Sequence, residues 1–400
     1  MKKIIKSIVT GIVSEQYERM VTLFPVLVVL LASIAFIFGG RCAQWQWWVA
    51  MVVSIGIAGR DGLWRRTAMA GILFVLYLAV IWVLCRINWV GCWNDYQEYH
   101  MPAVRMLIAG WNPLHEATLE HIASSLSVDP ATFRPWHVLS MCKSAWYYNA
   151  VAYFFMREPY NIMSPVYYAL LPAVVLQLWK AMREVSRVVR VTMIVLLVSY
   201  CPGPFMAVDA IVALAGIGLL LSFREILATG RWRWEMLVAF SFWLLTVKQM
   251  AGICCVLFWF GFMIIMVCLK REFFKSCFLI SLIVGAMSVL TTLSPYYTSW
   301  SNYGHPLYPC YSSDKERYPI VDIVEDFLYR NDDAAAMGHL GAAVNAYVST
   351  ALAKVYYALQ LSQSSSVIRR LMHLTPTLSR ILPVPVPVCR GYPARTDSRG

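Results

Sequence analysis

Apolar and polar positions along the chain fall into long blocks, in which hydrophobic runs are separated by short polar and basic segments. A helix needs about 20 largely apolar residues to cross a bilayer, and fewer suffice where the bilayer thins or protein partners help. The pattern therefore predicts an all-α integral membrane protein with a bundle of about nine transmembrane helices. The predicted spans cover residues 21–39, 45–59, 67–85, 162–180, 191–205, 207–222, 234–248, 251–268 and 276–293. A further run at 144–156 is short and punctuated, so we expect it to be interfacial or re-entrant.

The composition supports this fold class and argues against a nucleic-acid partner. Of the 400 residues, 59% are hydrophobic and 14% are charged, and the mean hydropathy of +0.58 is unusual for a soluble domain. The net charge is +12, but the basic residues fall in short groups between apolar runs. Such groups mark membrane topology and contact lipid headgroups. The 11 cysteines show neither a CxxC pair nor a zinc-ligand spacing.

The basic groups also predict the orientation, because Lys and Arg near span ends stay in the cytoplasm. If nine spans cross the membrane in turn from a cytoplasmic N-terminus, an assignment we call the nine-span threading, every one of these groups lies in the cytoplasm. They are Lys2, Lys3 and Lys6; Arg60, Arg65 and Arg66; Lys180, Arg183, Arg187 and Arg190; Arg224, Arg231 and Arg233; and Lys270, Arg271 and Lys275. The unusual polar features then share the opposite, extracytoplasmic face, as an active site on that face would.

The threading divides the chain into four parts. We expect a cytoplasmic amphipathic N-terminus, a transmembrane bundle that includes a large outer loop, an extracytoplasmic aromatic and helical segment, and a tail rich in Pro and Arg that is disordered or truncated. These parts cover residues 1–20, 21–293 with the outer loop at 86–161, 294–361 and 362–400.

The first polar feature is the segment WNDYQEYHMPAVRM, which places Asp95, Glu98 and His100 near the start of a short helix. Gly110 is expected to end this helix, which begins either at Asp95 or near Pro102. In one interpretation Asp95 caps the helix and Glu98 favours its N-terminus. In the other, the two carboxylates form an acid pair, with one acting as a general base and the other holding a metal or orienting an acceptor.

Three ionisable residues border apolar runs on the same face: Lys143, Asp209 and Lys248. They are either interfacial residues that snorkel or groups that face a partner or a watery cavity. In the functional interpretation the lysines bind phosphate, and Asp209 holds a hydroxyl or a cation.

The last feature is SPYYTSWSNYGHPLYP, which follows the final predicted span. Its composition is typical of an interfacial aromatic belt. Aromatic rings and amides also suit a sugar, by stacking on its C–H faces and hydrogen-bonding its hydroxyls. The candidate binding residues are Tyr296, Asn302, His305 and Tyr308.

Taken in order, these pieces resemble bacterial multi-pass glycosyltransferases of the GT-C fold, which use sugars carried on a polyprenyl phosphate. The resemblance rests on D…YH.PA…GWNP from Asp95, K-x-x-W from Lys143, a Lys248 to Gly252 junction, and SPY.T…N.G.P.YP from Ser294. The likeness spans roughly residues 23–357.

The resemblance implies a helical bundle in the bacterial inner membrane, with its active site at the outer surface and Asp95 as catalytic base. Glu98 would be a second acid. The family often carries acids closer together than the three-residue separation found here, which leaves open a divalent cation, Mg²⁺ or Mn²⁺, as cofactor. A second departure lies at the end of the chain. Members of the family commonly carry further spans after the aromatic motif, whereas no span is predicted here after about residue 362.

The expected activity is transfer of a hexose or pentose from a polyprenyl-phosphate donor to an envelope glycan, lipid or protein, with inversion. The lipid tail would lie between helices. Two alternatives remain: an O-antigen-type polymerase or ligase, and a transporter or flippase of lipid-linked sugars. Internal inverted repeats would favour the transporter, and none is evident in the sequence.

Overall fold

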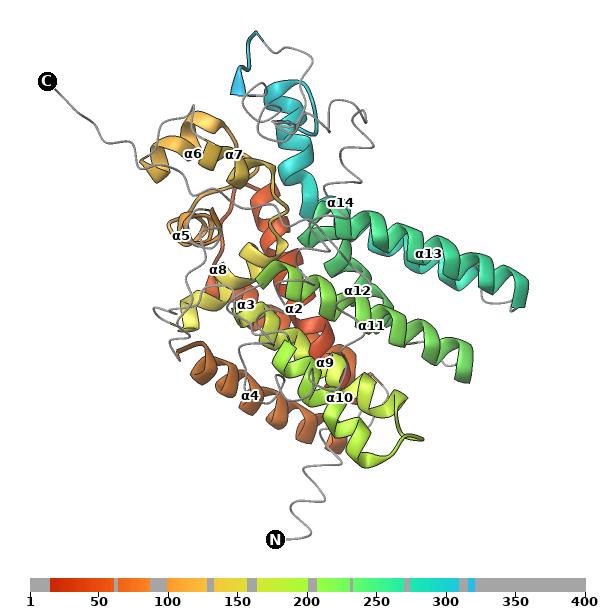
Figure 1. Cartoon of the computed structure of the whole chain (residues 1–400). Helices are drawn as coiled ribbons and strands as arrows, with labels where there is room; N and C mark the ends of the chain where they lie inside the picture. Colours follow the sequence, from red (N-terminus) through yellow and green to blue (C-terminus); the bar gives the residue numbers. More distant parts are fainter. Residues whose placement is uncertain are drawn as a thin grey trace, which may run out of the picture. The chain divides into compact units, whose positions relative to one another are not determined.

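The computed structural model describes residues 15–60, 64–86, 99–127, 133–156, 164–200, 207–230, 233–269, 274–308 and 316–320. Within these residues every regular element is a helix (Figure 1). The helices are α2 (Glu15–Ile37), α3 (Gln44–Gly59), α4 (Trp64–Arg86), α5 (Met101–Ile108), α6 (Leu119–Leu126), α7 (Phe133–Ser140), α8 (Ser144–Met156), α9 (Ser164–Ala181), α10 (Arg187–Tyr200), α11 (Ala207–Thr229), α12 (Trp234–Val247), α13 (Gln249–Leu269) and α14 (Phe274–Tyr303).

Each apolar run that predicted a span forms a helix, so the all-helical fold is confirmed for the described residues. Five helices are both long and apolar enough to cross a membrane: α2, α4, α11, α13 and α14. Helices α3, α10 and α12 have 16, 14 and 14 residues and fall short of that length. The coarser prediction of a helical membrane protein is therefore supported, and the number of nine spans stays a prediction.

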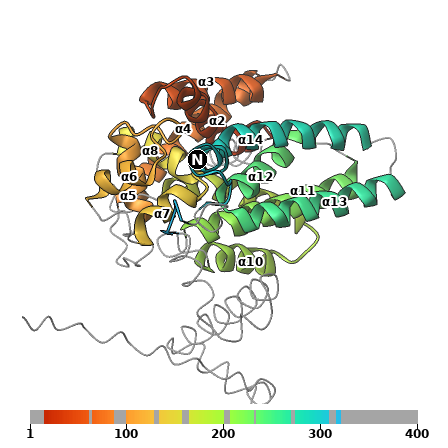
Figure 2. The same cartoon turned by 90° about the horizontal axis from the view of Figure 1, so that it is seen from above.

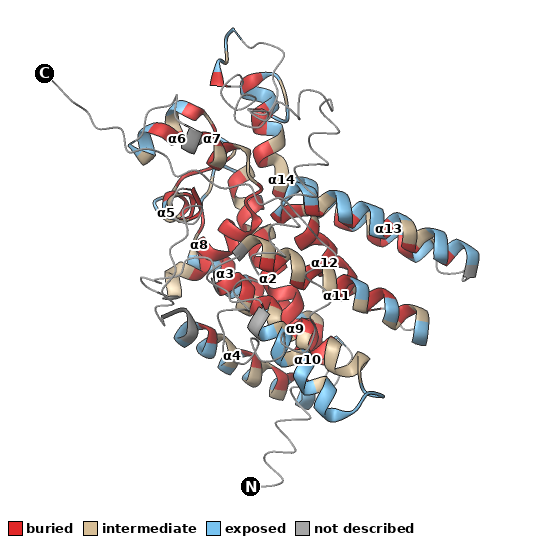
Figure 3. Cartoon of the chain, in the orientation of Figure 1, coloured by how far each residue is buried: buried red, intermediate tan, exposed pale blue. Residues whose placement is uncertain are grey.

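Helix α2 forms the centre of the bundle. It packs against α3, α4, α8, α9, α12 and α14, and Figure 3 shows buried residues concentrated along it. In contrast, α13 exposes large apolar side chains such as Leu257 and Phe260, which are 63% and 65% exposed. Apolar exposure over a whole helix is costly in water and favourable against lipid.

Helix α11 approaches α12 closely because Gly218 has no side chain. A Cβ at this position would lie 2.5 Å from the ring of Phe240. The two helices lie side by side in both Figure 1 and Figure 2. This packing aligns the start of α11 with the end of α12, which matters for the site described below.

The 144–156 run forms α8 with the predicted bounds. Ser144 Oγ donates to Thr246 O near the end of α12, and Trp82 Nε1, near the end of α4, donates to Phe155 O. In the nine-span threading, the ends of α4 and α12 fall on one side. Because Trp146, Tyr147 and Tyr148 are buried, α8 lies within protein, as a re-entrant segment does.

Candidate functional site

Asp95 and Glu98, the predicted catalytic acids, lie outside the described residues. The description resumes at Tyr99, just before α5. Pro102 stands in the first turn of this helix, and Gly110 follows it with φ +105°, a left-handed conformation that favours glycine. The α-helix α5 thus carries Pro102 in its first turn and ends before Gly110, and the alternative start at Asp95 lies outside the described residues.

His100 is buried beside α8, where its Nδ1 accepts a 2.8 Å hydrogen bond from Trp146 Nε1. Burial lowers the pKa of His100 to about 3, and His137 and Lys248 act in the same direction while Asp209 opposes them. The ring is therefore neutral at neutral pH. Charged and titratable groups far away in the chain thus act on this imidazole.

Lys143 lies at the start of α8 and is 1% exposed. Its ammonium donates to Leu139 O at 3.0 Å and Met141 O at 2.9 Å, near the end of α7. Burial lowers the pKa of Lys143 to about 7. In this conformation Lys143 supports the α7–α8 connection, and it would have to release these bonds to bind a phosphate.

Asp209 and Lys248 form an ion pair at the junction of α11, α12 and α13. Lys248 Nζ lies 2.7 Å from Asp209 Oδ1, with the two side chains 45% and 37% exposed. Asp209 stands in the first turn of α11, where the helix dipole favours a carboxylate. The pair is open to solvent or ligand, unlike Lys143. We name Asp209, Lys248, His100 and Lys143 the outer polar cluster, after the face on which the nine-span prediction places them.

The aromatic motif divides between two places. Tyr296 joins the outer polar cluster, since its hydroxyl lies 4.0 Å from the Sγ of Cys142, the neighbour of Lys143. Pro295 and the non-helical Ser294 kink α14 just before Tyr296.

The rest of the motif contacts the segment around Ala117, which belongs to the predicted outer loop. Asn302 Nδ2 donates to Ala117 O at 2.9 Å. Tyr308 stacks on Tyr303 with ring centroids 3.8 Å apart, and His305 Nδ1 accepts from the Leu307 backbone. These contacts place the motif beside the start of α6. A structural role thus accounts for Asn302 and Tyr308 as they lie.

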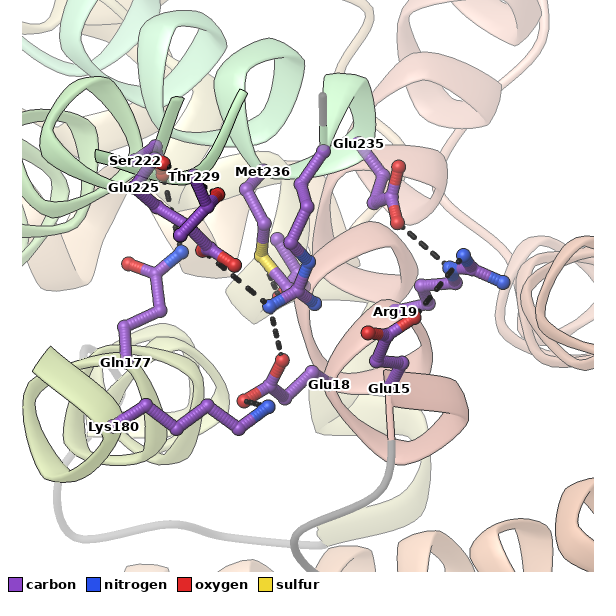
Figure 4. A network of polar contacts seen from close by, with 12 residues as sticks. Glu15, Glu18, Arg19, Gln177, Lys180, Ser222, Glu225, Thr229, Glu235 and Met236 are labelled. Atoms are coloured by element: carbon purple, nitrogen blue, oxygen red, sulfur yellow. Dashed lines mark hydrogen bonds and ion pairs between the residues drawn. The ribbon is translucent and has the colours of Figure 1, made fainter. Parts of the chain in front are cut away.

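A buried ion-pair network that the sequence did not predict lies at the start of α2 (Figure 4). The Glu18 carboxylate, with an exposed fraction of 0%, contacts Lys180 Nζ at 2.6 Å and pairs with Arg233. Beside it, Arg19 Nε lies 2.7 Å from Glu235 Oε1. This network was not among the polar features that were expected to share the extracytoplasmic face, and that expectation stays a prediction.

The network joins the start of α2, the end of α9 and the start of α12. Glu225, near the end of α11, lies 3.9 Å from Arg233. At the opposite end of α2, Asn112 Nδ2 donates to Phe36 O and Gly40 O. The nine-span threading likewise puts the start of α2, the ends of α9 and α11 and the start of α12 on one side, and the end of α2 and Asn112 on the other. Which of these sides is cytoplasmic remains a proposal.

Among the described residues, no group of three or more His, Cys, Asp or Glu side chains is arranged to hold a metal ion. The acid pair for which Mg²⁺ or Mn²⁺ was considered lies outside those residues. Comparisons of the chain with protein-family models, curated proteins and solved structures found no match. The function is therefore argued from the chain's own residues.

Proposed function

We propose that the protein is an integral-membrane glycosyltransferase. It takes a monosaccharide from a polyprenyl-phosphate donor and passes it to a glycan, lipid or protein acceptor at the extracytoplasmic face of a bacterial inner membrane. The proposal includes the GT-C arrangement of about nine spans with the N-terminus in the cytoplasm. The observation that supports it best is the half-exposed Lys248–Asp209 pair. Both charges act on the pKa of His100, the residue just before α5, and the segment that carries Asp95 and Glu98 leads into this helix.

In the proposed reaction, Asp95 takes the proton of the acceptor hydroxyl or amine as that group attacks the anomeric carbon. The bond from this carbon to the phosphate oxygen breaks, and the polyprenyl phosphate departs on the opposite face, which inverts the centre. Lys248 stabilises the departing phosphate, because its ammonium is accessible and can leave Asp209 for a doubly charged anion. Lys143 and His305 are the further residues proposed to stabilise this phosphate, and Glu98 orients the acceptor.

The test is transfer of label from radiolabelled polyprenyl-phosphate sugars to an acceptor in membranes that contain the full chain. Asp95→Asn should lower transfer by about 10²-fold or more, the range of general-base contributions. Lys248→Gln should lower it by about 10²-fold, as does loss of a group that stabilises developing negative charge. Lys275→Gln is the matched control, since Lys275 is exposed at the start of α14.

Retention of transfer by Asp95→Asn would remove this residue from the mechanism. Equal losses in Lys248→Gln and Lys275→Gln would remove Lys248 in the same way. Absence of turnover with every donor would contradict the transferase itself.

A transporter of lipid-linked sugars is the second candidate. The buried network around Glu18 favours it, because ionisable groups buried in membrane proteins often serve ion or substrate pathways. Movement of a fluorescent lipid-linked sugar between leaflets of vesicles, with no transfer to any acceptor, would support this function in place of the enzyme.

A further inference from the structure

A cavity of about 600 Å³ lies against α5 and α6, apart from the outer polar cluster. Polar and aromatic side chains line part of it: Arg105, Trp111, Glu116, His121 and Ser125. Ligand pockets commonly have volumes of roughly 300 to 1,000 Å³. The cavity is thus large enough for a small organic molecule.

The turn after α5 gives the cavity a fixed rim. Asn112 is buried, and its Oδ1 accepts from Leu114 N and His115 N while its Nδ2 holds the end of α2. Trp111 Nε1 donates to Glu116 O at 3.0 Å. Because these bonds hold the GWNP turn in place, the groups around the cavity are positioned before any ligand arrives.

Hydrogen-bonding capacity remains around this rim. Arg105 is exposed in the last turn of α5, and no hydrogen bond or ion pair of its guanidinium is found among the described residues. Glu116 Oε2 accepts from Asn112 N at 2.9 Å and lies 3.8 Å from His121 Nε2, which leaves Oε1 as an acceptor. Ser125 adds an exposed hydroxyl.

The charges discriminate between classes of ligand. A simple anion attracted by Arg105 would also meet the Glu116 carboxylate, and a cation attracted by Glu116 would meet the guanidinium. A neutral molecule with several hydroxyls satisfies both, because hydroxyls donate to carboxylates and accept from guanidinium groups. Apolar side chains of Pro102, Met106 and Leu126 on the wall suit the C–H face of a sugar ring.

We infer that this cavity is a carbohydrate-binding subsite that holds the acceptor. Its role as an acceptor site rests on the proposed function, whereas sugar binding itself does not require turnover. The subsite lies on the helix that directly follows the segment carrying Asp95 and Glu98 in the chain. A ligand hydroxyl bound at α5 would therefore lie against the part of the chain that directly follows the proposed base, Asp95, in sequence.

The experiment measures binding of neutral mono- and disaccharides to the purified full chain in detergent by saturation-transfer NMR and calorimetry. Ala109→Trp places an indole in the cavity from an exposed position at the end of α5. Arg105→Met removes the guanidinium and keeps an apolar stem. The matched controls are Ala228→Trp, at an exposed position in the last turn of α11, and Arg65→Met, at an exposed position in the first turn of α4.

At least one sugar should bind the wild type, and Ala109→Trp should abolish that binding. Arg105→Met should weaken it by about tenfold or more, since the lost bonds involve a charged group. Both controls should bind as the wild type does. Failure of every sugar to bind, survival of binding in Ala109→Trp, or equal loss in Ala228→Trp would overturn the inference.

The results that would contradict the proposed function differ from those that would contradict the subsite. If sugars bind in this cavity but no donor supports transfer, the subsite stands and the transferase does not. If transfer occurs and Ala109→Trp leaves the acceptor KM unchanged, the transferase stands and the subsite does not.

Discussion

Replacing Arg233 by methionine is expected to destabilise the protein strongly, because it removes one partner of a buried carboxylate. Glu18 is fully buried and touches two cations, Arg233 and Lys180. Breaking a buried ion pair by deleting one partner costs about 3 to 5 kcal/mol, since the other charge is left uncompensated. Lys180 lies 2.6 Å from Glu18 and is left in place by the substitution, so we expect the lower end, about 3 kcal/mol.

A double-mutant cycle separates the charge effect from lost packing. Glu18→Gln alone should also cost about 3 kcal/mol, since it takes from Arg233 its nearest carboxylate and leaves the more distant Glu225. The double variant should be at least about 1 kcal/mol more stable than the sum of the single effects, because removing both charges leaves neither uncompensated. That coupling is the signature of the pair.

The assay is unfolding of the full chain in mixed micelles, followed by circular dichroism as a denaturing detergent is titrated. Arg183→Met is the control, because Arg183 and Glu184 form a pair whose side chains are 77% and 88% exposed. Its expected effect is within about 0.5 kcal/mol. If Arg233→Met changes stability no more than this control, or if the cycle shows no coupling, the network does not hold the helix ends together.

Three further perturbations test other contacts. Because burial lowers the pKa of Lys143 from 10.5 to about 7, the unfolded chain binds more protons between those values, and stability should rise with pH across this window. Lys143→Met should flatten the rise measured in unfolding titrations at pH 7 and 9, and an unchanged slope would contradict the assignment. Asn112→Ala removes four side-chain hydrogen bonds and should cost about 3 kcal/mol of unfolding free energy; a loss below about 1 kcal/mol would show that the GWNP turn is held by other means. Tyr303→Phe loses the hydroxyl that accepts from Leu119 N and should cost about 1 kcal/mol, measured against Tyr297→Phe at an exposed position of α14; equal effects would assign the loss to the ring.

The helices were predictable from sequence because their signals are local. Apolar length set the runs, and the Pro102 and Gly110 positions marked the two ends of α5. The bounds of α8 matched because Lys143 before it and charged residues after it interrupt the apolar pattern.

The Glu18 network could not be predicted in the same way. Glu15 to Arg19 fall in the predicted cytoplasmic N-terminus, ahead of the first predicted span, and nothing local in the sequence shows that α2 includes them. Arg19 and Glu235 lie 216 residues apart. Only the packing of α2 against α12 brings such groups together, and an unpaired charge at a span end would otherwise snorkel to water.

The outer polar cluster was predicted only in part, because it too depends on tertiary packing. Sequence position placed Lys143, Asp209, Lys248 and Tyr296 near span ends on one face, and tertiary packing brings these ends together. Asn302 was predicted on the same grounds, yet its amide is used to hold the outer loop at Ala117. Chemical type alone does not separate a side chain that binds a ligand from one that braces a loop.

The two ion pairs at opposite ends of α12, Lys248 with Asp209 of α11 and Arg233 with Glu18 of α2, show why the two ends suit different roles. Separating a half-exposed pair such as Lys248 and Asp209 costs about 0 to 1 kcal/mol, because water solvates both charges. Separating Glu18 from Arg233 costs several times more, because the carboxylate is sealed from solvent. A phosphate can therefore recruit Lys248 without unfolding anything around it, whereas the Glu18 network resists exchange of partners. This difference in cost, rather than residue type, is the physical reason for assigning ligand contact to one end of the bundle and stability to the other.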